Sequence, residues 1–455
     1  MPSTKNILLI ALASLLSACA KLSYQPIPTI EQIDHQKGYR LRQALDRQQN
    51  QEDLFVVLTL SGGGSRAAAL GYGVLEALAQ QNIALNGRQS NLLEEIDLVY
   101  GISGGSVLAM YFALHGKDTI PQFLQRFLAH NFQDTLIEKV FSLANVARLT
   151  SPEFGRGDLL QEEFENSLFG EATFADLARR RGPFAVISAT DMTQGIQIDF
   201  TQEFFDWLCV DLSALPIARA VAASSAVPLV FSPITLNNHG GQCGNPQQYS
   251  ELLAKNTEEH SEQAKIRNDM LTQFQSYQES QKRPYLHLLD GGLTGNLGLR
   301  SMQTIVNLSG GNEKNLYMQL TKGRANRIVL INVNAQNQID SDIDQSPAVP
   351  GFQDSLNAII NIPIDQSSAD AIRQMRLIVD EWNQAEHRDQ QGRKISLHFI
   401  ELSLKDLADE TLRHQVLNIP TSFALPGKDV NALRQAATEL LKQSSDYQSL
   451  IEQLR

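Results

Sequence analysis

One stretch constrains the fold of this chain more than any other. An apolar, β-prone run, residues 96–100, breaks at a glycine-rich turn, residues 101–105, and a helix-forming run, residues 107–114, follows at once. The turn fits the pattern G-x-S-x-G, which places a serine, here Ser103, at the tip of a tight turn between strand and helix. The amino terminus of the following helix favours negative charge beside that hydroxyl. A plain Gly/Ser turn has the same pattern, so the role of Ser103 depends on the rest of the chain.

Two other apolar runs also end in glycine-rich turns. Residues 54–60 lead into Gly62, Gly63 and Gly64, and residues 285–289 lead into residues 290–292. Runs that are nearly continuous in apolar residues are typical of strands buried on both faces of a parallel α/β sheet. The alternation of strand, turn and helix predicts a doubly wound α/β architecture. Because ligands bind at the carboxyl ends of such strands, the three turns would meet in one crevice if the strands are parallel.

The first turn offers successive backbone N–H groups at the start of a helix. Such a nest binds anions, and an acyl-transfer enzyme needs one for the oxyanion of its tetrahedral intermediate. Arg66 adds positive charge or fixes the loop. Dinucleotide binding is the alternative, since Gly62, Gly64 and Ala67 fit G-x-G-x-x-A, but the second strand ends in the serine turn and not in the acidic residue that this motif requires.

A serine hydroxyl is a weak nucleophile and needs a base within hydrogen-bond reach. None of the nine histidines lies in a glycine-rich turn at a strand end, whereas Asp290 does. Asp290 is therefore the candidate base, although an Asp-Gly turn is also common at strand ends for conformational reasons alone.

Together these motifs resemble the patatin-like phospholipase family. The segments 62–66, 101–105 and 290–292 occur in the order found in that family, and residues 218–229 resemble its small-residue helix and proline turn. The resemblance covers residues 54–299. It implies a three-layer α/β/α fold with a mainly parallel central sheet, and phospholipid or lysophospholipid as substrate.

The resemblance also implies a Ser–Asp dyad that works without histidine. Ser103 is then the nucleophile and Asp290 the general base. The oxyanion side is formed by four residues: Gly62, Gly63, Gly64 and Arg66. This chemistry requires no metal and no other cofactor.

The amino terminus predicts export. Lys5, the apolar residues 7–16 and the small residues 17–18 make a secretory signal peptide, whose apolar run is too short to span a bilayer comfortably. Residues 16–19 also resemble the lipobox of bacterial lipoproteins, which implies cleavage before Cys19 and acylation of Cys19. Two or more acyl chains hold a protein stably on a membrane. Ala20, where an aspartate would signal retention at the inner membrane, resembles the pattern for the outer membrane.

The net charge limits the possible partners, and two further cysteines leave the question of a disulfide open. A net charge of −12 argues against a nucleic-acid partner. Cys209 and Cys243 can form a disulfide in an oxidising compartment or stay unpaired, and the sequence does not decide between these states.

We predict a signal peptide at 1–18, a tether at 19–50, a catalytic domain at 51–305 and a C-terminal α/β extension at 306–455. Within the catalytic domain, the polar residues 246–283 are interpreted as a solvated helical insertion or loop, with a lid as the alternative.

The sequence thus predicts a membrane-anchored serine acyl hydrolase of the bacterial cell envelope that acts on membrane lipid. Two alternatives remain. The first is a Ser-His-Asp α/β-hydrolase, whose histidine would be His387, His398 or His414. The second is an envelope lipoprotein that binds lipid without turnover. The sequence does not indicate an oligomeric state.

Overall fold

The computed structural model describes residues 25–47, 53–85, 87–179, 182–246, 261–308, 313–338, 343 and 347–454. The predicted signal peptide and the predicted lipidation site at Cys19 lie outside these residues. No helix in the described ranges combines the length and the apolar composition needed to cross a membrane.

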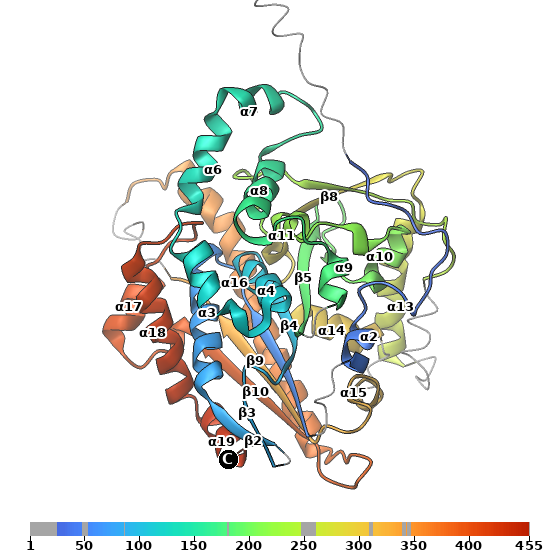
Figure 1. The fold of residues 1–455 in the computed structure, drawn as a ribbon, viewed down its shortest axis with the longest axis vertical. Coiled ribbons are helices and arrows are strands. Elements are labelled where there is room, and N and C mark those ends of the chain that lie inside the picture. Colours follow the sequence, from blue (N-terminus) through green and yellow to red (C-terminus); the bar gives the residue numbers. More distant parts are fainter. Residues whose placement is uncertain are drawn as a thin grey trace, which may run out of the picture.

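A mixed, mainly parallel sheet forms the centre of the molecule (Figure 1). Its strand order is β10-β9-β1-β4-β5-β8-β7, and β6 pairs with β5 outside this path. The strands from β10 to β5 run parallel, whereas β6 and β8 are antiparallel to β5, and β7 is antiparallel to β8. The strands are β1 (Leu54–Leu60), β4 (Ile96–Ile102), β5 (Phe184–Asp191), β6 (Gln197–Asp199), β7 (Ile234–Asn237), β8 (Tyr285–Asp290), β9 (Arg327–Asn334) and β10 (Ser396–Ser403). A separate hairpin consists of β2 (Asn82–Leu85) and β3 (Arg88–Asn91).

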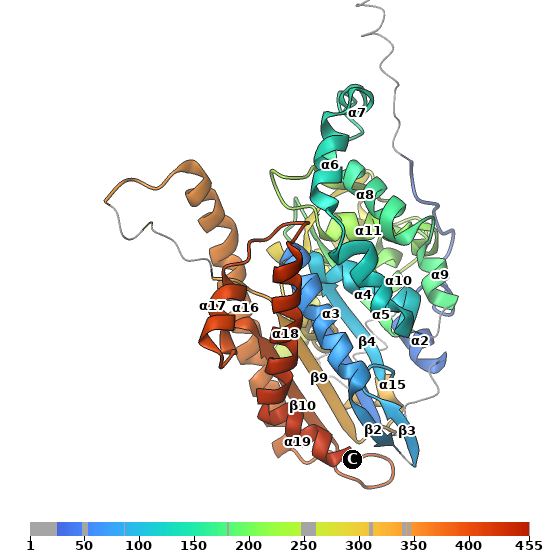
Figure 2. The ribbon, with the colours of Figure 1, turned by 60° about the vertical axis from the view of Figure 1, so that its left-hand side comes forward.

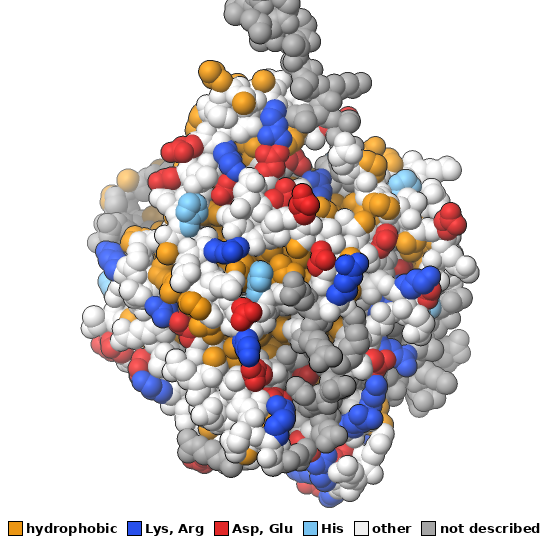
Figure 3. All heavy atoms as spheres, in the orientation of Figure 1, with side chains coloured by type: hydrophobic (Ala, Val, Ile, Leu, Met, Phe, Trp, Pro, Cys, Tyr) orange, Lys and Arg blue, Asp and Glu red, His pale blue; other side chains and the backbone are white. Residues whose placement is uncertain are grey.

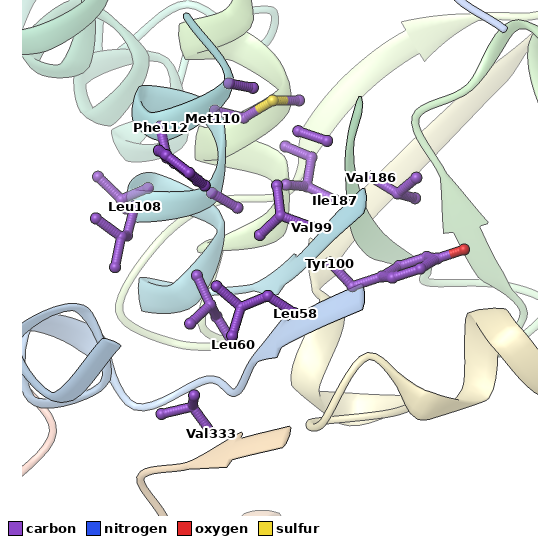
Figure 4. Packing of buried hydrophobic residues seen from close by; sticks show 14 of the residues in the cluster. Leu58, Leu60, Val99, Tyr100, Leu108, Met110, Phe112, Val186, Ile187 and Val333 are labelled. Atoms are coloured by element: carbon purple, nitrogen blue, oxygen red, sulfur yellow. The ribbon is translucent and has the colours of Figure 1, made fainter. Parts of the chain in front are cut away.

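The apolar runs became the central strands because both of their faces are covered. Every residue of β1, β4 and β5 is buried. In Figure 4, Leu58, Leu60 and Val99 point from their strands toward a helix on one face, while Tyr100 and Val186 point to the opposite face. Alternate side chains of one strand therefore enter different halves of the core.

Helices cover both faces of the sheet and confirm the predicted three-layer α/β/α fold (Figure 2). One layer contains α3 (Gly64–Gln80), α4 (Gly104–His115), α11 (Ile217–Ser224), α18 (Gly427–Gln443) and α19 (Ser445–Gln453). The other contains α2 (Leu41–Arg47), α13 (Glu262–Gln275), α14 (Leu299–Leu308), α15 (Glu313–Thr321) and α16 (Phe352–Gln384).

The remaining helices lie in the connections between these elements. They are α5 (Thr119–Phe123), α6 (Phe132–Phe141), α7 (Leu143–Arg148), α8 (Arg156–Phe164), α9 (Phe174–Arg179), α10 (Gln202–Phe205) and α17 (Glu410–Leu417). Among them, α6 and α7 project from one end of the molecule in both views, and α7 lies across the tip of α6 (Figures 1 and 2). The chain turns back toward the molecule after α7 (Figure 1), and we call this projection the hairpin.

The predicted C-terminal extension is part of the same sheet. β9 pairs with β1 over the whole length of β1, and β10 pairs with β9. The predicted boundary between residues 305 and 306 lies inside α14. β9 and β10 therefore complete the catalytic sheet, and the described residues after 305 do not form a separate unit.

Residues 25–47, predicted to belong to a tether, are packed against the rest of the chain. The Ile27 N–H group donates to Asn237 Oδ1 at 2.9 Å, and the buried Arg40 forms an ion pair with Asp206 at 2.8 Å. The described part of the predicted tether, residues 25–47, thus buries apolar and charged groups in the domain and is not a free linker. Residues 48–50 of that prediction lie outside the description.

The two cysteines that the sequence left open are paired. A disulfide joins Cys209 and Cys243, whose Cα atoms are 5.6 Å apart. Of the polar insertion, residues 247–260 lie outside the description. The described part forms α13, which packs against α14, so the helical interpretation of this part is confirmed.

Candidate active site

Ser103 lies at the junction between β4 and α4 in a strained backbone conformation. Its φ and ψ angles are 50° and −121°, a region that residues other than glycine rarely adopt. Hydrogen bonds hold the turn on both sides. The Ser103 N–H group donates to Ser224 Oγ at 3.0 Å, and the Ser103 carbonyl accepts from the Ser106 hydroxyl at 2.6 Å. The nucleophile position predicted from the sequence is thus fixed by α11 and by the first turn of α4.

Glycine is required beside Ser103 because two strand-end turns touch there. A Cβ atom on Gly104 would lie 2.0 Å from the Gly64 carbonyl oxygen, and one on Gly105 would lie 2.4 Å from the Leu60 carbonyl oxygen. Both distances are far below contact between real atoms. The absence of side chains therefore allows the turn after β1 to pack directly on the turn after β4.

Asp290 is the hydrogen-bond partner of the Ser103 side chain. Ser103 Oγ donates to Asp290 Oδ2 at 2.7 Å, and the Gly292 N–H group donates to Asp290 Oδ1 at 2.8 Å. The Asp290 N–H group donates to the Ala226 carbonyl at 2.9 Å. Both side chains are buried, with 6% of Ser103 and 7% of Asp290 exposed. The carboxylate is thereby held with one oxygen toward the serine.

β8 does not run parallel to β1 and β4, the condition under which the sequence placed the three turns in one crevice. Ile102 at the end of β4 pairs with Ser188 of β5, and the next residue, Ala189, pairs with Asp290. Because β5 continues past the end of β4, the antiparallel β8 enters from beyond the sheet edge and ends level with Ser103. The two groups meet although their strands run in opposite directions.

Burial sets the acidity of Asp290. Desolvation raises the pKa of its carboxyl group to about 6, while the hydrogen bonds from Ser103 and Gly292 act in the opposite direction. At neutral pH the group is therefore ionised, yet it binds a proton more tightly than an exposed aspartate. These are the properties of a general base that accepts the proton of a serine.

The predicted oxyanion residues divide into two groups. The Gly62 N–H group donates to the Asn296 carbonyl at 3.0 Å, so this amide fixes the loop and is not directed to a substrate. Gly63 and Gly64 precede and begin α3, and their amides make no hydrogen bond within the described residues. The prediction for Gly62 therefore needs correction, whereas the amides of Gly63 and Gly64 fit an anion nest at a helix amino terminus.

Arg66 has a different set of partners from the one predicted. Its guanidinium group is buried and donates to the carbonyls of Ala335 and Ile419, both at 2.8 Å, and to Asn337 Oδ1 at 3.2 Å. Burial lowers its pKa to about 10, so it remains protonated at neutral pH. Of the two roles considered for Arg66, these contacts favour fixing the loop.

Sequence reasoning missed three residues around the dyad. Asn296 accepts from the Gly62 N–H group, Ser224 accepts from the Ser103 N–H group, and the Ser422 carbonyl accepts from the Ser65 N–H group at 2.8 Å. Two signals were available: Asn296 follows Asp290 by only six positions, and Ser224 lies in the segment 218–229 that resembles the family. The contact of Ser422 uses its backbone, and no residue pattern reports such a contact.

No histidine contacts the Ser103 side chain in the described part of the chain, where its hydroxyl donates to Asp290. His398 lies in β10, which β9 and β1 separate from β4, and its Nε2 atom is 2.9 Å from Ser396 Oγ. His387 packs on Trp382, and His414 lies in α17. The same residues contain no cluster of three or more side chains that suits a metal ion.

Comparison with known sequences identifies the family. A sequence profile described as patatin-like phospholipase matches residues 58–302, more than half of the chain. The chain belongs to the patatin-like phospholipase family. This is a family of serine lipid acyl hydrolases, and the matched segment contains both Ser103 and Asp290. No curated protein sequence matched the chain.

Several solved structures are similar to this patatin-like protein. Human GIVD cytosolic phospholipase A2 aligns with a TM-score of 0.45 and 14% identity, over 91% of this chain and 64% of that chain. The chain thus spans less than two thirds of the human protein. VipD from Legionella pneumophila aligns with a TM-score of 0.34 and 11% identity, over 97% of this chain and 73% of that chain. ExoU of Pseudomonas aeruginosa, in complex with SpcU, aligns with a TM-score of 0.25 and 13% identity, over 89% and 91%.

Proposed function

We propose that this protein is a membrane-anchored lipid acyl hydrolase that cleaves fatty-acyl esters of phospholipids or lysophospholipids through a Ser–Asp dyad. The observation that carries the proposal is the 2.7 Å hydrogen bond from Ser103 to the buried carboxylate of Asp290. Gly104, the residue after Ser103, lies against the Gly64 carbonyl, which brings the turn that contains Gly63 and Gly64 next to this pair. A nucleophile, its base and an anion nest are the groups that acyl transfer requires.

The reaction proceeds in two halves. Asp290 Oδ2 accepts the proton of Ser103 as Oγ forms a bond to the ester carbonyl carbon, and the amides of Gly63 and Gly64 stabilise the oxyanion. The tetrahedral intermediate collapses, the ester C–O bond breaks, and the leaving alcohol takes the proton from Asp290. A water molecule then gives a proton to Asp290 and attacks the acyl-enzyme, which releases the fatty acid and restores Ser103.

The cellular location belongs to the same proposal. The signal-peptide pattern followed by Cys19 supports a lipid-modified amino terminus, and Ala20 supports the outer membrane as its destination. An anchored enzyme meets its substrate in the membrane that holds it. Replacing Cys19 with serine should release the protein from the membrane fraction, which fractionation of cells would show.

Hydrolysis by the purified protein tests the dyad. Wild-type protein should release fatty acid from phospholipid or lysophospholipid, and Ser103→Ala and Asp290→Asn should each lower the rate by at least about 1,000-fold. Full activity in either variant would rule out the dyad.

Replacement of His387, His398 and His414 together by alanine is the matched control for the histidine alternative. This variant should retain wild-type activity, because the Ser103 hydroxyl donates to Asp290 and none of the three histidines contacts it within the described residues. If wild-type protein binds lipid but releases no fatty acid from any ester, the alternative of a non-catalytic lipid-binding lipoprotein takes the place of this proposal.

A further inference from the structure

The hairpin of α6 and α7 exposes apolar side chains that have no cover within the described residues. Leu143 is 93% exposed and Phe141 is 77% exposed, and Ile137 and Val146 are about half exposed. Orange side chains mark this tip at the upper end of Figure 3. We call these four residues, together with Leu229 and Val230, the hairpin surface.

Two cations at the base of the hairpin surface turn away from it. Lys139 pairs with Glu163 and Arg148 pairs with Glu162, so both cations are directed to α8. Residues 140–147 contain no charged side chain. The tip is therefore an uncharged apolar projection, and the cations where it joins the domain are neutralised by ion pairs. Such exposed apolar surface costs free energy in water and is typical of an interaction site.

The base of the hairpin is linked to the candidate active site. Gln133, in the first turn of α6, accepts a hydrogen bond from the Phe423 N–H group, and the neighbouring Ser422 holds the turn that contains Gly64. The connection from the hairpin base to the anion nest thus passes through two adjacent residues.

The other part of the hairpin surface is linked to the catalytic base. Ala226, which accepts from the Asp290 N–H group, lies three residues before Leu229. Leu229 is 61% exposed although its φ angle is 69°, and Arg156 of α8 holds its carbonyl at 2.8 Å. A large apolar residue kept exposed in a strained conformation beside an active site indicates a function for its position.

The start of the described chain lies at the same end of the molecule. Both ribbon views place the first described residues, in dark blue, at the upper end near α7 and α8 (Figures 1 and 2). Six residue steps separate Cys19 from Gln25. A fully extended chain of that length reaches at most about 20 Å, so an acylated Cys19 would keep this end of the molecule close to the lipid.

We propose that the hairpin surface inserts into the lipid bilayer and presents the active-site end of the protein to its substrate. This inference rests on the proposed function and adds the surface through which the enzyme meets the membrane. The net charge of −12 gives no attraction to anionic lipid, so any contact beyond the acyl anchor has to come from apolar surface. Bilayers of phosphatidylcholine, which carries no net charge, are therefore the suitable membrane for the test.

Fluorescence tests the insertion without any need for catalysis. Leu143→Trp is placed in the full, anchored chain and reconstituted in vesicles of phosphatidylcholine brominated on its acyl chains, which quenches tryptophan in the apolar layer. Leu377→Trp is the matched control, because Leu377 is 61% exposed on α16 in the other helical layer. Trp207 and Trp382 are buried and give the same background in both variants.

Insertion predicts that the fluorescence added by Leu143→Trp falls by at least about half in brominated vesicles, while that of Leu377→Trp does not change. Equal fluorescence of the Leu143→Trp protein in brominated and plain vesicles would overturn the proposal. If the Leu143→Trp protein is not quenched in brominated vesicles and the wild-type protein forms a dimer in detergent, the proposal is overturned. The surface would then be assigned to contact with a second copy of the chain.

A charged variant separates this inference from the proposed function. Phe141→Asp combined with Leu143→Asp should lower hydrolysis of vesicle phospholipid by at least about tenfold, with hydrolysis of a soluble short-chain ester within about twofold of wild type. Equal loss on both substrates would contradict a docking role. If wild-type protein cleaves neither ester, the proposed function fails, and the fluorescence experiment still decides whether the surface inserts.

Discussion

At the scale of single residues, the site depends on a carboxylate that is buried and still ionised at neutral pH. Ser103 and the Gly292 amide each donate one hydrogen bond to Asp290, and no cation pairs with its carboxylate within the described residues. A bound cation would lower the pKa of the carboxyl group and weaken it as a base. The raised pKa thus makes the carboxylate a stronger proton acceptor than an exposed aspartate, while the group stays ionised at neutral pH.

The pH dependence of hydrolysis follows from this acidity. The base acts in its deprotonated form, so kcat/KM on a soluble ester should fall as the pH is lowered through about 6 and should approach a tenfold loss per pH unit below that. Initial rates between pH 4.5 and 8 measure it, with circular dichroism to show that the fold persists. A rate that stays constant down to pH 4.5 would contradict the assignment of Asp290 as the base.

The raised pKa of Asp290 also makes the folded chain less stable at neutral pH than at acid pH. The pKa of Asp290 is about 6 in the folded chain and 3.8 in the unfolded chain, so the folded state binds the proton more tightly. The stabilising effect of this proton is complete below pH 4 and is lost as the pH rises through about 6, which amounts to roughly 3 kcal/mol. Asp290→Asn should therefore become more stable relative to wild type as the pH rises from 4 to 7. Urea unfolding at both values measures this, and a difference that does not depend on pH would refute it.

At the scale of elements, the site is made by turns that touch through their backbones. Gly104 lies against the Gly64 carbonyl, and the segments that contain Ala335, Ile419 and Ser422 hold the turn after β1 from the other side. The helices and strands supply rigid ends, and close contact between the turns sets the distance from the nucleophile to the anion nest.

Gly104→Ala should separate these turns. The added Cβ atom would lie 2.0 Å from the Gly64 carbonyl oxygen, so one turn has to move. Displacement of catalytic groups by about 1 Å costs about 100-fold in rate, and a loss of at least this size in kcat is expected. Gly427→Ala is the control, since nothing lies within 4 Å of a Cβ atom at that position. Equal activity in the two variants would contradict the proposed role of the turn contact.

Many of the strands and turns could be predicted from the sequence, because their signals are local. The strand at 54–60 was predicted with the bounds that the structure has, because a buried strand and its glycine turn are local signals. The direction of β8 was not, since strand direction depends on partners far away in the chain. The partners of Arg66 were missed because Ala335 and Ile419 accept through backbone carbonyls more than 260 positions away.

At the scale of the whole molecule, the catalytic sheet is completed by its last two strands. β9 covers one edge of β1, the strand that carries the anion nest, and β10 covers β9. The sequence did separate the resemblance to known enzymes from the residues after 305, but it had no means to show that both parts share one sheet. Pairing between distant strands leaves no periodic pattern in either strand.

A truncated chain tests this dependence. A protein that ends at residue 321 lacks β9 and β10, so β1 would become an exposed apolar edge strand. We expect the truncated protein to be insoluble or inactive, as measured by soluble yield and ester hydrolysis. A soluble, fully active truncated protein would show that the C-terminal part is a separate unit after all.

Labelling with a fluorophosphonate probe is the most direct test of the central claim, that Asp290 activates Ser103 for attack. The probe bonds covalently only to an activated serine, and mass spectrometry of the peptides locates the adduct. The account predicts an adduct on Ser103 in wild-type protein, none in Ser103→Ala, and labelling slowed by at least about 100-fold in Asp290→Asn. An adduct on another residue, or labelling of Asp290→Asn at the wild-type rate, would contradict it.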